Sequence, residues 1–221
     1  MHRLVTPELL DSDSGTPAEI AASLSDLCRI NQWFGGISTT TSMLRNLAKR
    51  TGSSSLSVLE VAAGGGDVPR AVSIRLRENG VRMKATLLDR SSSHLPRSGS
   101  SAVVGDAVAL PLATDSFDAV SCCLFVHHLS PADFVRFVQE ALRVCRIAVV
   151  INDLIRHPLH LGLVYAGWPL YRSRLTKHDA PASVRAAYTV AEICELLRQT
   201  SAREVVVHRY YLFRMGVVIW K

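Results

Sequence analysis

A short apolar run that leads directly into three consecutive glycines is the feature that most constrains the fold of this chain. Residues 58–61 have the composition of a buried strand, and Gly64, Gly65 and Gly66 follow after two alanines. Glycine permits sharp turns and a close ligand approach that a Cβ would block. In open α/β sheets, a strand, a glycine-rich turn and a helix hold nucleotide-like ligands at the carboxyl ends of the strands. The run therefore predicts an α/β domain with a ligand site at this turn.

Further apolar runs also end in polar or glycine residues. They are Ala85–Asp89, Ala102–Ala107, Phe117–Cys123 and Ile147–Ile151. The third run leads into Leu124-Phe125-Val126-His127-His128-Leu129, and the fourth is followed by Asn152 and Asp153. Polar residues at strand ends face the ligand crevice in such a sheet, so these positions are candidates for a shared site.

These motifs, in this order, resemble class I S-adenosylmethionine-dependent methyltransferases, especially the small-molecule branch of the ubiquinone and menaquinone biosynthesis type. The resemblance covers roughly residues 56–155. It implies an α/β fold, with a Rossmann-like seven-stranded mixed sheet whose last strand is antiparallel, flanked by helices and a small N-terminal helical cap. It also implies S-adenosylmethionine as the cofactor and S-adenosylhomocysteine as the product.

The resemblance assigns cofactor-binding residues one at a time. Glu60 matches the acid near the methionine amino group, and Gly64 and Gly66 match glycines that approach the methionine and ribose. Asp89 matches the acid that binds both ribose hydroxyls, and Asp106 matches the acid that accepts from the adenine amine. The full implied set is Glu60, Ala62, Gly64, Gly66, Asp89, Arg90, Asp106, Ala107 and Phe125.

Two features depart from the family pattern. Ala62 stands where the family has its first glycine, which is tolerable if its φ stays negative. Asp89 lies 25 positions after Gly64, against a usual spacing of about 20, so the intervening helix or loop is expected to be extended. Asp67 follows the glycines instead of the Gly-Lys-Ser/Thr of a phosphate-binding loop. An acid at this place also disfavours a dinucleotide pyrophosphate.

The chemistry of methyl transfer needs few reactive side chains. The sulfonium methyl group is already electrophilic, so the protein mainly orients the acceptor and, for an oxygen acceptor, removes a proton. His127 and His128 are candidate bases because an imidazole titrates near pH 6.5; alternatively they line the cofactor site or cap the next helix. Asp153 is a candidate to contact the acceptor or to orient a histidine, the alternative being that it caps the following helix.

Aromatic and charged residues beyond residue 155 predict an acceptor pocket, because small-molecule sites are mostly apolar with few polar groups. Tyr165 and Trp168 lie in an apolar stretch, and His178 and Arg185 follow it. Trp33 is the candidate contributed by the N-terminal helices. The alternatives are that the aromatics only pack the cap onto the core and that His178 and Arg185 belong to a surface ion-pair cluster.

The order of these segments predicts the organisation of the chain. Residues 1–52 form an N-terminal helical cap, and residues 53–221 form the methyltransferase domain, with an acceptor-site insertion around 155–188. Two strands at 204–209 and 213–220 are expected to form the antiparallel hairpin that closes the sheet.

Composition narrows the remaining possibilities. The longest apolar runs are too short to span a bilayer, and the N-terminus lacks a signal-peptide core, so a cytoplasmic location and no membrane span are expected. Five cysteines without C-x-x-C spacing support neither disulfides nor zinc, and no metal site is predicted. The net charge is +6, but the lysines and arginines are dispersed along the chain and do not alternate with aromatic residues. No nucleic-acid partner is therefore expected.

The sequence thus predicts methyl transfer from S-adenosylmethionine to a hydroxyl of a small hydrophobic acceptor of aromatic or polyketide-like type, with oxygen as a preference over carbon or nitrogen. The alternatives are a protein or RNA methyltransferase and a non-catalytic, cofactor-binding subunit. No Asn-Pro-Pro-Tyr-type motif follows the fourth strand, which counts against methylation of amino groups on bases or glutamine. A monomer or homodimer is expected.

Overall fold

A single mixed β-sheet forms the centre of the molecule. The computed structural model describes residues 1–12, 14–96 and 101–221. Its strands are β1 (Ser55–Val61), β2 (Arg82–Asp89), β3 (Ser101–Val104), β4 (Phe117–Cys123), β5 (Cys145–Leu154), β6 (Glu204–Tyr210) and β7 (Arg214–Trp220). Their order across the sheet is β3-β2-β1-β4-β5-β7-β6. β1 to β5 run parallel, and β7 is antiparallel to both of its neighbours. The predicted sheet is therefore confirmed.

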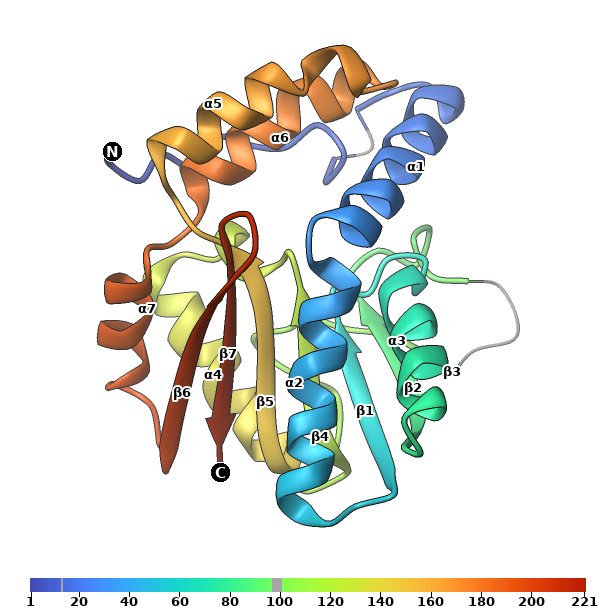
Figure 1. Cartoon of the computed structure of the whole chain (residues 1–221), viewed down its shortest axis with the longest axis vertical. Helices are drawn as coiled ribbons and strands as arrows, with labels where there is room; N and C mark the ends of the chain where they lie inside the picture. The colour runs from blue at the N-terminus through green and yellow to red at the C-terminus, as the bar shows by residue number, and fades with distance from the viewer. Residues whose placement is uncertain (13, 97–100) are drawn as a thin grey trace.

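Helices cover both faces of the sheet and also lie across one end of it (Figure 1). They are α1 (Pro17–Trp33), α2 (Gly36–Thr51), α3 (Asp67–Glu78), η1 (Val126–His128), α4 (Pro131–Val144), α5 (Pro158–Ala166), η2 (Trp168–Leu170), α6 (Arg174–Ala186) and α7 (Val190–Leu197). α2 and α3 pack on one face, while α4 and α7 pack on the other. α1, α5 and α6 form a cap above the sheet (Figure 1).

The alternating side chains of β1 supply both hydrophobic cores. Leu56 and Val58 belong to the core shared with α2 and α3, whereas Leu59 and Val61 belong to the core shared with α4 and α7. Successive residues of a strand point to opposite faces, so a strand covered by helices on both sides is apolar nearly throughout. This double burial fixes the register of β1 and places its carboxyl end, with the glycine turn, at the edge beneath the cap.

Capping residues set the starts of three helices. Thr16 and Thr189 each form a capping box, with Glu19 and Glu192 respectively. Ser130 accepts from the Asp133 N–H at the start of α4. Each cap satisfies backbone donors that would otherwise lack partners in the first helical turn.

β5 is longer than predicted and carries two polar residues in its interior. It runs to Leu154, so Asn152 and Asp153 are strand residues, and His157 is the N-cap of the next helix. The alternative that Asn152 and Asp153 cap that helix is therefore wrong. The Asn152 amide instead donates to the carbonyl oxygens of Gly35 (3.2 Å) and Gly36 (2.8 Å). This buried amide joins the start of α2 to the centre of the sheet.

The first 52 residues do not all lie in the cap. α1 packs against α6, whereas α2 packs against α3, β5 and β7 on a face of the sheet. The division of the chain at residue 52 stays a prediction. Within the ranges that the structure describes, no helix is long and apolar enough to cross a membrane.

Replacing Asn152 by alanine should lower the free energy of unfolding by about 1–2 kcal/mol, because the buried Gly35 and Gly36 carbonyls would lose the amide donor. The effect is no larger because these carbonyls keep the Thr39 N–H and the Thr40 hydroxyl as donors. Chemical denaturation of wild type and Asn152→Ala measures this. Asn79→Ala is the matched control, since Asn79 is exposed and its amide donates to the Arg75 carbonyl at 2.8 Å; a change within about 0.5 kcal/mol is expected. Equal effects of the two substitutions would contradict the role given to Asn152.

Candidate functional site

The turn after β1 adopts the left-handed backbone conformation at three positions. The φ angles are +54° at Ala62, +49° at Gly64 and +73° at Gly66. The negative φ on which Ala62 was expected to depend is therefore not observed. The chain must reverse direction as soon as β1 ends, and an alanine in this conformation costs about 1–2 kcal/mol. Local strain of this kind is found at ligand sites.

The Asp89 carboxylate ties the end of β2 to the glycine turn. Its Oδ2 accepts from the Gly64 N–H at 2.9 Å, and its Oδ1 accepts from the Ser91 N–H at 3.0 Å. The 25-residue spacing is absorbed by α3 and the full length of β2, so Asp89 still reaches the turn. A carboxylate has about four acceptor positions, so two hydroxyl groups of a ligand could still donate to it.

The other predicted cofactor residues surround this turn from three strands. Asp106 is exposed after β3, where its Oδ1 accepts from the Val108 N–H at 3.0 Å, and the neighbouring Ala107 is buried. Arg90 is exposed directly after β2. Phe125, after β4, is half-buried, and its ring meets that of Phe137 edge to face at 5.4 Å. The ends of β1 to β4 thus bring the predicted residues to one edge of the sheet.

Glu60 is a carboxyl group buried inside the sheet. It lies one residue before the end of β1, it is 3% exposed, and it pairs in register with Ser121 of β4. Burial raises the pKa of Glu60 to about 7, although the Ser121 hydroxyl opposes this shift. A cationic ligand group beside Glu60 would favour its ionised form.

Asp153 organises the segment that follows β4. Its Oδ2 accepts from the backbone N–H groups of Phe125 (3.1 Å) and His127 (3.2 Å), and its Oδ1 lies 2.7 Å from His127 Nδ1. Asp153 and His127 are both almost fully buried. These bonds fix the His127 ring, so that its Nε2 faces away from the sheet. It points towards residues 1–12, which form the N-terminal segment.

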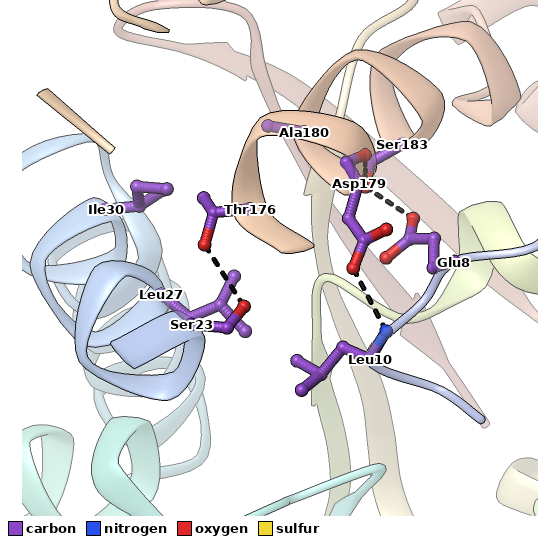
Figure 2. Close-up of a pocket in the computed structure, with 9 residues that line it drawn as sticks. All are labelled: Glu8, Leu10, Ser23, Leu27, Ile30, Thr176, Asp179, Ala180 and Ser183. Carbon is purple, nitrogen blue, oxygen red and sulfur yellow. Dashed lines mark hydrogen bonds between the residues drawn. The ribbon is translucent and has the colours of Figure 1, made fainter. Parts of the chain in front are cut away.

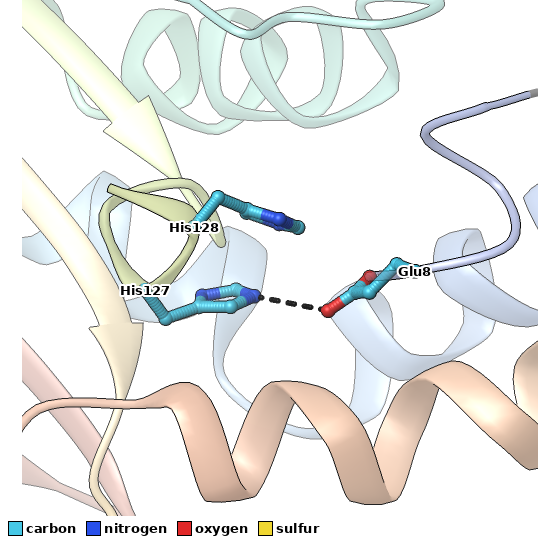
Figure 3. Close-up of side chains that lie close together, drawn as sticks. All are labelled: Glu8, His127 and His128. Carbon is cyan, nitrogen blue, oxygen red and sulfur yellow. Dashed lines mark ion pairs between the residues drawn. The ribbon is translucent and has the colours of Figure 1, made fainter. Parts of the chain in front are cut away.

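Two acids of that N-terminal segment meet the histidine pair. Glu8 Oε1 lies 3.6 Å from His127 Nε2, and Asp11 Oδ2 lies 3.1 Å from His128 Nδ1. Figure 3 shows the two imidazoles side by side, with Glu8 approaching from a separate stretch of chain. Sequence reasoning did not find Glu8 or Asp11, because their polar segment carries no motif or periodicity.

The electrostatic setting of His127 differs from that of a free imidazole. Burial alone would lower its pKa, but the Asp153 and Glu8 carboxylates overcome this and raise the pKa of His127 to about 10. While both carboxylates stay in contact, His127 therefore carries a proton at neutral pH. Asp153 has the larger effect, so withdrawal of Glu8 alone would not make His127 a general base.

The N-terminal segment is held against α6 and η1. Arg3 donates to the carbonyl oxygens of Ala186 (2.7 Å) and His127 (2.9 Å). The Asp179 carboxylate accepts from the N–H groups of Leu9 (2.8 Å) and Leu10 (3.1 Å). This segment of the chain therefore forms one wall of the site.

A small pocket lies between this segment, α1 and α6 (Figure 2). Its apolar lining residues are Leu10, Leu27, Ile30 and Ala180. The hydroxyls of Ser23 and Thr176 bond to each other at 3.1 Å across it, and Ser183 donates to Glu8. Glu8 therefore contacts both the pocket and His127, and the pocket ends next to the histidine pair.

The five residues predicted to bind the acceptor lie elsewhere on the cap. Trp33 is 63% exposed at the end of α1. Tyr165 and Trp168 meet edge to face at 5.8 Å, and the Arg185 guanidinium donates to the Tyr165 hydroxyl at 2.7 Å. His178 Nδ1 is 2.8 Å from the carboxylate of the next residue. None of the five belongs to the described lining of the pocket, and their part in acceptor binding stays a prediction.

The core of the chain matches a known family. Residues 59–149 match a family model described as a methyltransferase domain. The chain carries a class I S-adenosylmethionine-dependent methyltransferase domain. S-Adenosylmethionine is therefore the cofactor of this methyltransferase. No curated protein matches the chain.

Solved structures agree with the fold of the methyltransferase. The plantazolicin methyltransferase BpumL, in complex with a pentazolic desmethylPZN analog and SAH, has a TM-score of 0.70 at 12% identity, over 97% of this chain and 95% of that chain. Magnesium protoporphyrin IX methyltransferase (ChlM) from Synechocystis PCC 6803, with bound SAH, has a TM-score of 0.52 at 14% identity, over 83% and 82%. A putative O-methyltransferase from Nostoc punctiforme PCC 73102 has a TM-score of 0.54 at 13% identity, over 88% and 59%.

Glu60→Gln should remove a pH dependence from the stability of the methyltransferase. The pKa of Glu60 is about 7 in the folded chain against an ordinary 4.5, so the folded state keeps a proton between these pH values that the unfolded state has released. The free energy of unfolding of the wild type should therefore fall as pH rises through this window, by at most about 3 kcal/mol relative to Glu60→Gln.

Chemical denaturation of both proteins at about pH 5 and about pH 8 measures this difference. Glu78→Gln is the control, because Glu78 is an exposed acid at the end of α3. Parallel stability profiles for wild type and Glu60→Gln would show that the Glu60 pKa is not raised in the folded chain.

Proposed function

We propose that the protein transfers the methyl group of S-adenosylmethionine to a hydroxyl of a small, largely hydrophobic acceptor of aromatic or polyketide-like type. The observation that carries this proposal is the pocket between the N-terminal segment, α1 and α6. Its lining combines four apolar residues with polar ones, among them Glu8, the acid that contacts His127. Two similar structures, the citrinin polyketide synthase CMeT domain and the putative O-methyltransferase from Nostoc punctiforme, support the choice of acceptor class.

On the cofactor side, the proposed roles follow the positions of the side chains. The buried Glu60 binds the methionine ammonium group, whose charge favours the ionised carboxylate. Gly64 and Gly66, with Ala62, allow the methionine and ribose to approach the backbone. Asp89 accepts from the ribose hydroxyls. The residues proposed to contact the adenine or its surroundings are Arg90, Asp106, Ala107 and Phe125.

On the acceptor side, Asp153 positions His127, and His127 with His128 contacts the acceptor. The acceptor hydroxyl gives up its proton to solvent, and its oxygen attacks the methyl carbon in line with the carbon–sulfur bond. That bond breaks, and its electron pair stays on sulfur to release neutral S-adenosylhomocysteine. The main contribution of the histidine pair is to hold the acceptor oxygen in this line. The residues proposed to contact the outer part of the acceptor are Trp33, Tyr165, Trp168, His178 and Arg185.

The alternative functions require features that contrast with this site. A protein or RNA methyltransferase needs an open, charged rim, whereas this pocket is closed by the N-terminal segment, α1 and α6. A non-catalytic subunit would bind S-adenosylmethionine without turnover, and the strained Ala62 is the residue that favours this alternative. We further propose that the protein acts on a small molecule as a monomer or homodimer.

Asp89→Ala and Asp106→Ala should each weaken the binding of S-adenosylmethionine by at least about tenfold, since each removes a charged hydrogen-bond acceptor. Titration calorimetry with S-adenosylmethionine and S-adenosylhomocysteine measures the dissociation constants. Glu78→Ala, an exposed acid far from the strand ends, should bind as the wild type does. If neither strand-end substitution changed the dissociation constant, the proposed cofactor residues would be wrong.

Ala180→Phe should raise KM for the acceptor at least about tenfold, because the added ring fills the pocket beneath the cap. The dissociation constant for S-adenosylmethionine should stay within about twofold of the wild-type value. The acceptor comes from a turnover screen of phenolic and polyketide compounds, and Ala180→Ser is the small control at the same position. Unchanged acceptor kinetics in a folded Ala180→Phe would show that the acceptor binds elsewhere.

A further inference from the structure

Three side chains from two distant parts of the chain converge above the sheet. Glu8 comes from the N-terminal segment, and His127 and His128 come from η1. One ligand atom from each, a ring nitrogen of either histidine and a carboxylate oxygen of Glu8, lies within 4.8 Å of the other two. Figure 3 shows the two rings extending in the same direction towards Glu8; their centroids are 4.2 Å apart, and their planes differ by 33°.

We propose that Glu8, His127 and His128 form a binding site for a divalent transition-metal ion. Asp11 lies beside this group, because its Oδ2 is 3.1 Å from His128 Nδ1, and it adds negative charge next to the site. Two imidazoles and a carboxylate are ligands that Zn²⁺, Mn²⁺ and Co²⁺ accept together. Mg²⁺ and Ca²⁺ prefer oxygen ligands alone, so the nitrogen content of the site selects against them.

The environment of His127 is that of a metal-binding histidine. Asp153 Oδ1 lies 2.7 Å from His127 Nδ1, and the other oxygen of Asp153 is held by two backbone N–H groups. A carboxylate that accepts from one ring nitrogen leaves the other nitrogen available for a metal and fixes the ring orientation. In His127 that other nitrogen is Nε2, the atom that faces Glu8 at 3.6 Å. A metal ion would displace the proton that Nε2 carries while Glu8 and Asp153 contact the ring, so binding would release a proton.

The charge around the histidines also favours a cation. Three carboxylates, those of Glu8, Asp11 and Asp153, contact the two imidazoles. His127 and Asp153 are nearly fully buried, so their interactions are weakly screened by solvent. A divalent ion between the histidines and the N-terminal acids would offset this concentration of negative charge.

The site needs only a small contraction to close around an ion. Metal–nitrogen distances of about 2.0–2.1 Å place tetrahedral ligand atoms roughly 3.4 Å apart, compared with separations of up to 4.8 Å in the structure. η1 is fixed by its bonds to Asp153, so the N-terminal segment is the part that would move inward. A bound ion would thus fasten residues 8–11 to the end of the sheet.

The position of the ion suggests a role in methyl transfer. Glu8 also lines the pocket beneath the cap, so an ion held by Glu8 would lie at the end of the pocket. There it could bind and polarise an acceptor oxygen. This link to the acceptor rests on the proposed function, whereas the metal site itself does not depend on it.

Metal binding by the full chain, without acceptor, tests the proposal. Calorimetry with Zn²⁺ and with Co²⁺ should give one ion per chain with a micromolar or lower dissociation constant, and Mg²⁺ should give no heat. Co²⁺ should also produce visible absorption bands characteristic of its coordination by nitrogen and oxygen. Both readouts are independent of turnover.

Three variants and one control locate the ion. Glu8→Gln, His127→Ala and His128→Ala should each weaken Co²⁺ binding at least about tenfold and reduce the visible bands. His208→Ala is the matched control, because it removes an exposed histidine on β6 and should leave binding unchanged. Glu8→Gln and His128→Ala keep the test decisive if the buried His127→Ala does not fold, which circular dichroism would reveal.

Two results would overturn the metal site. One is a wild-type chain that binds well below one Co²⁺ or Zn²⁺ ion at concentrations of about 100 μM. The other is unchanged Co²⁺ binding in folded Glu8→Gln and His128→Ala. Binding of S-adenosylmethionine, measured on the same samples, separates failure of the metal site from failure of the proposed methyltransferase function.

Discussion

The buried carboxylate of Asp153 is the group on which the rest of the site depends. Its two oxygens accept from Phe125 and His127 backbone donors and from the His127 ring. Burying an ionised group is unfavourable unless its acceptor positions are filled, and here burial is outweighed by the His127 imidazole, so the pKa of Asp153 is lowered. One strand residue thus folds η1 onto the end of β5, places Phe125 beside the glycine-turn edge, and turns His127 towards the cap. Loss of the Asp153 carboxylate would therefore disturb both Phe125 and His127.

The second constraint is the return of the N-terminal segment to a site built more than a hundred residues later. Arg3 satisfies carbonyl oxygens at the end of η1 and α6, and Asp179 satisfies backbone donors at Leu9 and Leu10. These bonds set the position of Glu8, which could not reach His127 from a free terminus without losing conformational entropy on contact. The same few residues therefore form one wall of the pocket and bring Glu8 to the histidines.

Local patterns were enough to predict the fold and the strand-end acids, but not the closure of the site. Glu60 and Asp89 follow apolar runs of strand length, and the capping box at Thr189 has a local signature, so each could be recognised without a structure. The positive φ of Ala62 could not, because it depends on how sharply β1 must turn beneath the cap. Capping of the next helix stayed open as an alternative for the residues after Ile151, because no turn residue marks the end of β5. Glu8 and Asp11 contact His127 and His128 only through tertiary packing, which leaves no periodic trace in the sequence.

Two of the buried carboxyl groups, those of Asp153 and Glu60, differ in where their charge partner comes from. Asp153 has an imidazole partner within the chain, and its pKa is lowered. The pKa of Glu60 is raised by burial, with only the Ser121 hydroxyl opposing it, so a cation supplied by a ligand would change its ionisation most strongly. The methionine ammonium group of S-adenosylmethionine is such a cation. The chain therefore supplies the partner of Asp153 itself, whereas under the proposed function the cofactor supplies the partner of Glu60.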